Sequence, residues 1–109
     1  MSSTANITVV VSIGRGAHAS QEPLDERSWH WFRASVRTLL AEVVDGTVHV
    51  NSASSVGEWN GEPEESSTFV AEVPVHGLGA LRNGLRFLAA IHGQEAIALT
   101  TGHTEFVTP

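Results

Sequence analysis

The fold of this chain is decided by the stretch Ile7-Thr-Val-Val-Val-Ser-Ile13. Every residue in it except Ser12 is β-branched, and β-branched side chains favour extended strands. A run this apolar predicts a strand in the middle of a sheet, where both faces are at least partly covered. Gly14 follows the run and predicts the end of the strand.

A helix is predicted after the polar loop that reaches Pro23. Asp25 fits the N-cap, and Leu24 before it is expected to pack on Trp29 as a hydrophobic staple. The Asp45-Gly46 pair predicts the end of the helix, because glycine adopts the left-handed conformation that closes helices. The helix would bury one apolar stripe with three- and four-residue steps, namely Trp29, Phe32, Val36, Leu39, Leu40 and Val43.

The second half of the chain predicts three more strands and a second helix. In order, these are a strand over 47–54, a loop or irregular hairpin connection over 55–65, a strand over 68–75, a helix from Leu78 to Gly93, a strand over 94–101 and a possible short extra strand over 104–108. The resulting order is β-α-β-β-α-β, which predicts an α+β domain with the ferredoxin-like split βαβ topology. We expect one domain over residues 1–109, with a four-stranded antiparallel sheet, both helices on one face, and the spatial strand order fourth, first, third, second.

Composition excludes several classes of function. The chain has 109 residues, with six Arg, no Lys, twelve Asp plus Glu, no Cys and a net charge of −6. Without Cys there is no disulfide, no thiolate zinc site and no Cys nucleophile. An acidic chain without Lys is poorly suited to nucleic acid or to anionic membranes, so neither is expected as a partner. The polar start up to Asn6 and the short apolar run after it fit neither a signal peptide nor a membrane helix, which predicts a soluble, cytoplasmic protein.

Five short motifs occur in a fixed order along the chain. They are Leu24-Asp-Glu-Arg-Ser-Trp-His-Trp-Phe32, Asp45-Gly-Thr-Val48, Gly57-Glu-Trp59, Glu65-Ser66 and Gly93-Gln-Glu95. Together they resemble a bacterial and phage family of small α+β proteins that is known only as a domain of unknown function. The resemblance covers Pro23 to Val107 and implies a ferredoxin-like fold and a recurring Trp–Glu feature, but no activity. The chain departs from the family pattern at Ala41-Glu-Val-Val44, where a Pro-Arg-Phe-like stretch is usual, and no export signal is expected here, unlike in many members.

One candidate site is expected where the first strand ends. Arg15 lies between two glycines, whose backbone N–H groups can approach an anion, and an Arg can bind phosphate or carboxylate. The predicted topology groups it with His76 and Glu95, which could then act as a general acid–base pair. The alternative is a flexible turn with a solvated or ion-paired Arg.

A second candidate site is expected at the opposite edge of the sheet. There the topology groups Glu58, Trp59 and Glu65 with the end of the last strand and His103. Trp59 could supply an apolar wall and Glu65 a polar contact in a ligand pocket. Alternatively, Trp59 packs the loop onto the core and Glu65 caps backbone N–H groups. None of the six His has a metal-ligand spacing, so we expect no metal and no cofactor.

The face of the sheet away from the helices is predicted to be small and semi-polar. It would carry His49, Asn51 and Glu72 around a centre formed by Val10 and Val70. An RNA-binding sheet of this topology shows aromatic and basic residues, which are absent here. A semi-apolar face is better explained by a second subunit, so a homodimer is expected, although a small solvated face is an alternative.

We therefore favour a non-enzymatic binding or interaction module that self-associates. Four acids between Glu58 and Glu65 make the edge beside Trp59 negative, so a charged protein partner there should have a basic surface. The absence of Lys suggests a GC-rich source, such as an actinobacterium or its phage. A phage protein would be expected to act on a host protein. The alternative is a small cofactor-free enzyme of the dimeric ferredoxin-like type, with isomerase or oxidative chemistry at His49 and Glu72 or at the Arg15 edge.

Overall fold

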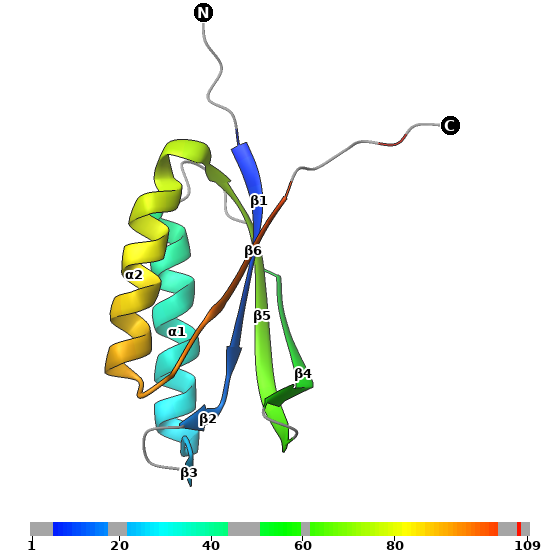
Figure 1. Ribbon diagram of the computed structural model, residues 1–109, viewed down its shortest axis with the longest axis vertical. Coiled ribbons are helices and arrows are strands. Elements are labelled where there is room, and N and C mark those ends of the chain that lie inside the picture. The colour runs from blue at the N-terminus through cyan, green and yellow to red at the C-terminus, as the bar shows by residue number, and fades with distance from the viewer. Residues whose placement is uncertain (1–5, 18–21, 44–50, 60–61, 103–106, 108–109) are drawn as a thin grey trace, which may run out of the picture.

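The computed structural model describes residues 6–17, 22–43, 51–59, 62–102 and 107 (Figure 1). For residues 51–59 and 62–64 it describes the backbone only. His49, the start of the predicted second strand and all of the predicted 104–108 strand except Val107 lie outside the described residues.

Strand β1, Asn6–Gly14, lies inside an antiparallel sheet with the order β4-β5-β1-β6. On one side it pairs with β5, Glu62–Pro74, from Asn6↔Pro74 to Gly14↔Ser66. On the other side it pairs with β6, Ala98–Gly102, from Thr8↔Gly102 to Ser12↔Ala98. The apolar run that predicted an inner strand therefore has a neighbour on each side.

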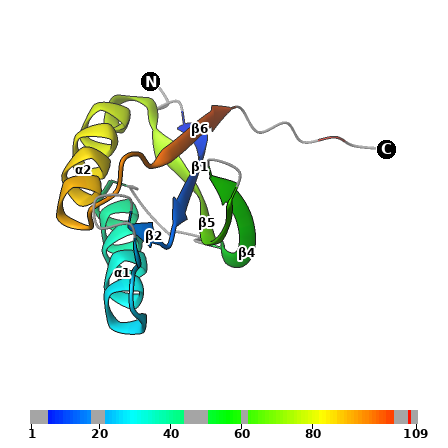
Figure 2. The same cartoon turned by 60° about the horizontal axis from the view of Figure 1, so that its bottom comes forward.

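Both helices cover the same face of the sheet (Figures 1 and 2). They are α1, Glu26–Val43, and α2, Leu78–Ile91, the latter entered through a single 3-10 turn, η1, Val75–Gly77. The core between the helices and the sheet contains Val9, Val11, Ile13, Trp29, Phe32, Val36, Leu40, Phe69, Ala71, Val73, Leu81 and Leu85. The predicted α+β class, with an antiparallel sheet and two helices, is confirmed.

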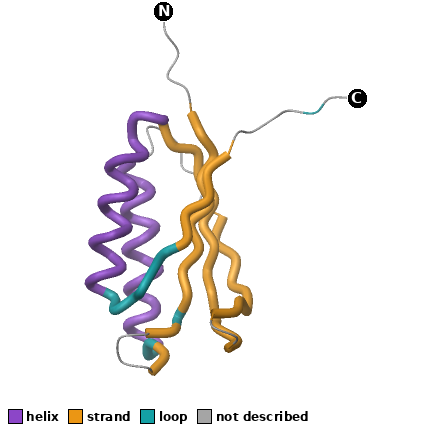
Figure 3. The backbone as a smooth tube through the Cα atoms, in the orientation of Figure 1, coloured by secondary structure: helices purple, strands orange, loops and turns teal. Residues whose placement is uncertain are grey.

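The hairpin of β4 and β5 is longer and more regular than predicted (Figure 3). Strand β4, Asn51–Trp59, pairs with β5 from Asn51↔Val70 to Trp59↔Glu62. The prediction of a loop or irregular connection over 55–65 is therefore wrong. Pro63 is tolerated because β5 has passed the end of β1 there and pairs with β4 alone, and prolines occur in strands that need few ladder hydrogen bonds.

Two further elements differ from the prediction. A short ribbon of β2, Gly16–Ala17, and β3, Glu22–Pro23, occupies part of the predicted polar loop before α1. Strand β6 begins at Ala98 rather than at residue 94, because Gly93, with φ of 65°, and the residues after it first carry the chain from α2 to the sheet.

Candidate functional site

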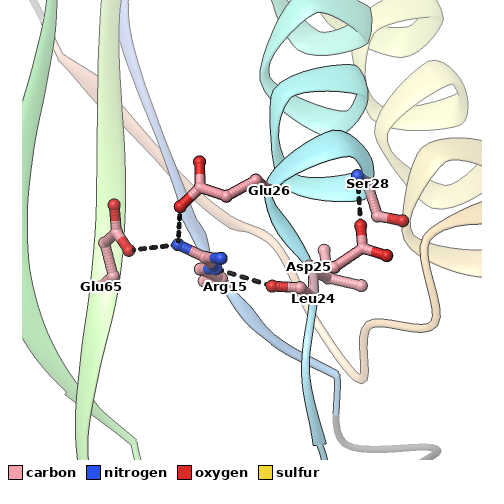
Figure 4. A network of polar contacts seen from close by, with 6 residues as sticks. All are labelled: Arg15, Leu24, Asp25, Glu26, Ser28 and Glu65. Carbon is pink, nitrogen blue, oxygen red and sulfur yellow. Dashed lines mark hydrogen bonds and ion pairs between the residues drawn. The ribbon is translucent and has the colours of Figure 1, made fainter.

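Arg15 is the centre of a polar network where β1, β5 and the start of α1 meet (Figure 4). Its Nη1 donates to Glu65 Oε2 at 2.8 Å and to Glu26 Oε1 at 3.1 Å. Its Nε donates to the carbonyl of Leu24 at 2.6 Å. The Arg15 backbone also links these segments, because its N–H donates to the Glu65 carbonyl and its carbonyl accepts from the Leu24 N–H.

These contacts give Arg15 a structural role. The hydrogen bond to Glu65, followed by that to Glu26, raises the pKa of the Arg15 guanidinium above its ordinary value. The cation is already matched by two carboxylates, which is a poor arrangement for holding a further anion. The alternative of an ion-paired Arg describes the structure, and the Glu65 carboxylate bonds a side chain rather than backbone N–H groups.

The predicted grouping of Arg15 with His76 is wrong. Antiparallel pairing sets Gly14, beside Arg15, opposite Ser66 at the start of β5, while the end of β5 at Pro74 lies opposite Asn6. His76, in the turn after β5, is therefore at the other end of the sheet and is exposed. Glu95 precedes the start of β6, and the first residue of β6, Ala98, pairs with Ser12. Glu95 therefore lies at the same end of the sheet as Arg15.

The second predicted grouping holds only in part. The β4–β5 register brings Glu58 and Trp59 into the same hairpin as Glu65, with Val56 opposite Glu65 and Trp59 opposite Glu62. The end of β6 is elsewhere, because Gly102 pairs with Thr8, far from Gly14. The placement of this strand end beside the hairpin is therefore wrong, and His103 lies outside the described residues. Whether Trp59 lines a pocket or packs on the core stays a prediction.

The sheet face opposite the helices, here called the open face, is the clearest candidate for a functional surface (Figure 3). Val10 is at its centre, opposite Val70 on β5 and Thr100 on β6. Ser12 and Thr68 lie within hydrogen-bond distance at 3.5 Å. Where β1 pairs with β5 and β6, the open face includes Thr8, Val10, Ser12, Thr68, Val70, Glu72, Ala98 and Thr100. Glu72, opposite Thr8, is the one charged residue of this set, and the register of β5 places Glu62 and Glu64 on the same face beyond it, in the hairpin with β4.

Of the predicted pair His49 and Glu72, the structure describes only Glu72. Glu72 is exposed on β5, which fits its predicted position on the open face. His49 lies outside the described residues, so the pair stays a prediction.

His92, at the end of α2, is a buried residue that the sequence analysis did not single out. Its ring is 5% exposed, stacks on Phe32 with centroids 4.5 Å apart, and meets Trp31 edge-on at the same distance. Burial lowers the pKa of this imidazole, and its Nε2 has no hydrogen-bond partner among the described residues. Its position just before a helix-ending glycine did not indicate burial, because a helix C-terminus favours a solvated histidine that can become a cation.

Two further kinds of feature, a metal site and a membrane-spanning helix, can be assessed in the described part of the chain. No three His, Asp or Glu residues there lie together as a metal site would require. No helix in these segments is long and apolar enough to cross a membrane.

Comparison with solved structures agrees with the α+β fold. A phage SAM lyase in complex with S-methyl-5′-thioadenosine superposes with a TM-score of 0.57 at 10% identity, over 88% of this chain and 79% of that chain. CutA from Synechococcus elongatus gives a TM-score of 0.47 at 16% identity, over 100% of this chain and 80% of that chain. No family model and no curated protein sequence matches the chain, so its resemblance to a domain of unknown function stays a prediction.

Proposed function

We propose that this chain is a ferredoxin-like split βαβ interaction module that forms a homodimer through the open face of its sheet. The strand order and the position of both helices on one face support this topology. The observation that carries the proposal is the composition of the open face around β1, where the side chains are small, nearly uncharged and apolar at the centre.

Charge favours this face over the rest of the surface as a contact between copies. Two chains that each carry a net charge of −6 repel one another as they approach. Where β1 pairs with its neighbours, the open face has one carboxylate, Glu72, which lies toward one end, and Glu62 and Glu64 lie beyond the other end in the hairpin. Two copies can therefore pair Val10 and Val70 around a two-fold axis with little like-charge contact.

The mass in solution tests this proposal. Light scattering coupled to size exclusion should give twice the 11.6 kDa of the chain. The V70E substitution should give one chain mass, because it would bury two carboxylates in the interface. V75E is the matched control, since Val75 is an exposed valine in η1 and not on the open face. A native chain that stays monomeric at high concentration would refute the dimer.

The β4–β5 hairpin is the proposed contact for a protein partner with a basic surface. Four of the twelve acids of the chain lie between Glu58 and Glu65. Glu65 is held by Arg15, which leaves Glu58, Glu62 and Glu64 as the carboxylates to test. Binding of a basic model peptide should weaken with added salt and with the E58Q/E62Q/E64Q variant, while E72Q on the open face should leave it unchanged. If the protein is encoded by a phage, the partner would be a host protein.

A small cofactor-free enzyme is the second candidate function. The observation that favours it is the likeness to a phage SAM lyase that was solved with a thioadenosine nucleoside. Thermal shift with S-methyl-5′-thioadenosine tests it, because a ligand that binds only the native state raises the melting temperature. A rise in melting temperature that E72Q abolishes would favour an enzyme at the open face, and no rise would favour the interaction module.

A further inference from the structure

A groove of about 440 Å³ runs between α1 and α2 and is open to solvent. Leu39 on α1 and Gly84 on α2 lie opposite each other in this groove. A Cβ atom on residue 84 would be 2.5 Å from Leu39 Cδ1, so the glycine allows the two helices to lie this close. Ala34 and Thr38 line the α1 side and are too small to fill the space.

Large apolar side chains are exposed beside this groove. Trp31 on α1 is 55% exposed and Phe87 on α2 is 66% exposed, and both line it. Ile91, one turn after Phe87, is also exposed. The Trp31 ring is held in place by its edge-on contact with His92. Exposed apolar groups that gather around a groove mark an interaction site, and fixed aromatic rings make effective anchors.

The helices are the positively charged side of an acidic chain. They carry five of the six Arg, against only Glu26 and Glu42, and α2 has no acid at all. Arg27 precedes Trp31 by one helical turn and therefore lies on the same side of α1. It adds positive charge at the aromatic end of the groove, whereas Glu42 lines the other end.

We propose that this groove binds an acidic amphipathic helix of a partner protein. Its apolar stripe would pack on Trp31 and Phe87, and its carboxylates would face Arg27 and the net positive charge of the two helices. The α1 wall extends from Trp31 to Glu42, eleven residue steps or roughly 16 Å, which matches about three turns of a partner helix. Glu42 determines which way the partner helix runs along the groove, because it favours a basic or neutral residue at the end of that helix that lies beside it.

A second copy of the chain is a poorer occupant. Its acidic hairpin has the complementary charge, but insertion of a hairpin into the helix groove of another copy joins two different surfaces. Such head-to-tail contacts either close into rings or grow into filaments. This surface is also separate from the open face, so the groove can be occupied whether or not the sheet forms a dimer.

The test uses two synthetic helical peptides of about 14 residues with the same leucine stripe, one with Glu and the other with Lys at the remaining positions. Binding to the whole chain is followed by the amide and indole NMR signals of the groove residues. The acidic peptide should shift the Trp31 indole and Gly84 amide signals. The basic peptide should bind at least about tenfold more weakly, since like charges meet at Arg27 and the helices carry more Arg than Glu.

Matched variants locate the contact. F87A should weaken the acidic peptide by about tenfold or more, because an exposed anchor is removed without disturbing the core. R27E, one turn before Trp31, should weaken it, whereas R82E, a charge reversal on α2 away from Trp31 and outside the groove lining, should do so much less.

Three outcomes would overturn the proposal. The first is no signal change at about 1 mM acidic peptide, a concentration that detects even weak complexes. The second is equal affinity for the two peptides. The third is a fall in the native mass on F87A, which would make a second copy the occupant. Because V70E tests the sheet dimer independently, the failure of either proposal can be recognised without the other.

Discussion

The two helices lie side by side on one face of the sheet, yet they begin in different ways. At α1, Asp25 Oδ1 accepts the Ser28 N–H at 2.7 Å, and Arg15 ties Leu24 and Glu26 to the ends of β1 and β5 (Figure 4). At α2, the chain enters through η1 with no side-chain cap, and the buried Leu81 and Leu85 secure the helix. A helix can therefore be positioned by polar contacts at its start or by apolar packing along its length.

This difference decides which substitutions should move each helix. For α1, the polar contacts at its start add to a buried stripe of four residues. For α2, the position of the helix depends almost entirely on the packing of its buried side chains. Substitution of a buried residue in the interior of α2 should therefore act strongly, and loss of a polar contact at the start of α1 should act more weakly.

L81A should have the largest effect. Leu81 is fully buried against the sheet, and removing its side chain should lower the free energy of unfolding by about 2–5 kcal/mol, which combines lost burial with a cavity. Urea denaturation measures this change. F87A in the same helix removes a larger but exposed side chain and should cost far less. Similar losses for both variants would contradict a helix held by its buried side.

Acidification should act next, through His92 at the junction of the two helices. Burial lowers the pKa of His92 in the folded chain, so the unfolded chain binds a proton more readily there. Stability should be complete above the ordinary histidine pKa of about 6.5 and should fall as the pH drops below it, until the folded pKa is passed. Unfolding free energies at about pH 7.5 and 5.5 measure this fall.

The matched variants for this prediction are H92N and H76N. H92N removes the titrating ring and should flatten the pH dependence between those values. H76N replaces an exposed histidine and should leave it unchanged. If native chain and H92N lose stability equally on acidification, His92 does not cause the fall.

D25A should have a smaller effect, confined to the start of α1. The hydrogen bond from the Ser28 N–H lowers the pKa of the Asp25 carboxyl, so its stabilisation is complete above the unfolded pKa and is lost as the pH falls through the lower folded value. We expect a fall of a few degrees in melting temperature at neutral pH. D25S should retain most of the stability, since serine also caps helices. A loss as large as that of L81A would contradict the division of roles.

The smallest effects should come from two glycines of α2. A Cβ atom added at Gly79 would have no other atom within 4 Å. G79A should therefore stabilise the helix by up to about 1 kcal/mol, because alanine has a higher helix propensity than glycine. G84A carries the same intrinsic gain, but its Cβ would press on Leu39, so it should be less favourable than G79A. Thermal melting of both variants compares them. An equal gain for both would show that the helices are not tightly apposed at Gly84.

Local signals in the sequence predicted several of these features. The β-branched run at 7–13 predicted an inner strand, and Asp25 predicted the start of α1 at Glu26. The predicted end of this helix at Asp45-Gly46 lies outside the described residues. These elements are set by side chains close in sequence, through capping and periodicity.

Features set by partners distant in sequence were not predicted. The hairpin over 55–65 was missed because Gly57 and Pro63 are ordinarily loop residues, and only pairing with the opposite strand makes them extended. Arg15 was grouped with His76 because the direction of β5 was assigned wrongly, which exchanged the two ends of the sheet. The groove at Trp31 and Phe87 depends on how the helices pack, and the helix stripes alone do not show that packing.

The register of the sheet has a further consequence for engineering the chain. Strand β1 begins at Asn6 and β6 finishes at Gly102, and the two strands are neighbours at one end of the sheet (Figure 1). A short linker could therefore connect these points, and new termini could be opened within the hairpin at the far end. Such a circular permutant would place β1 in the interior of the sequence and keep every strand pair, a rearrangement that domains tolerate when both cuts lie at the surface.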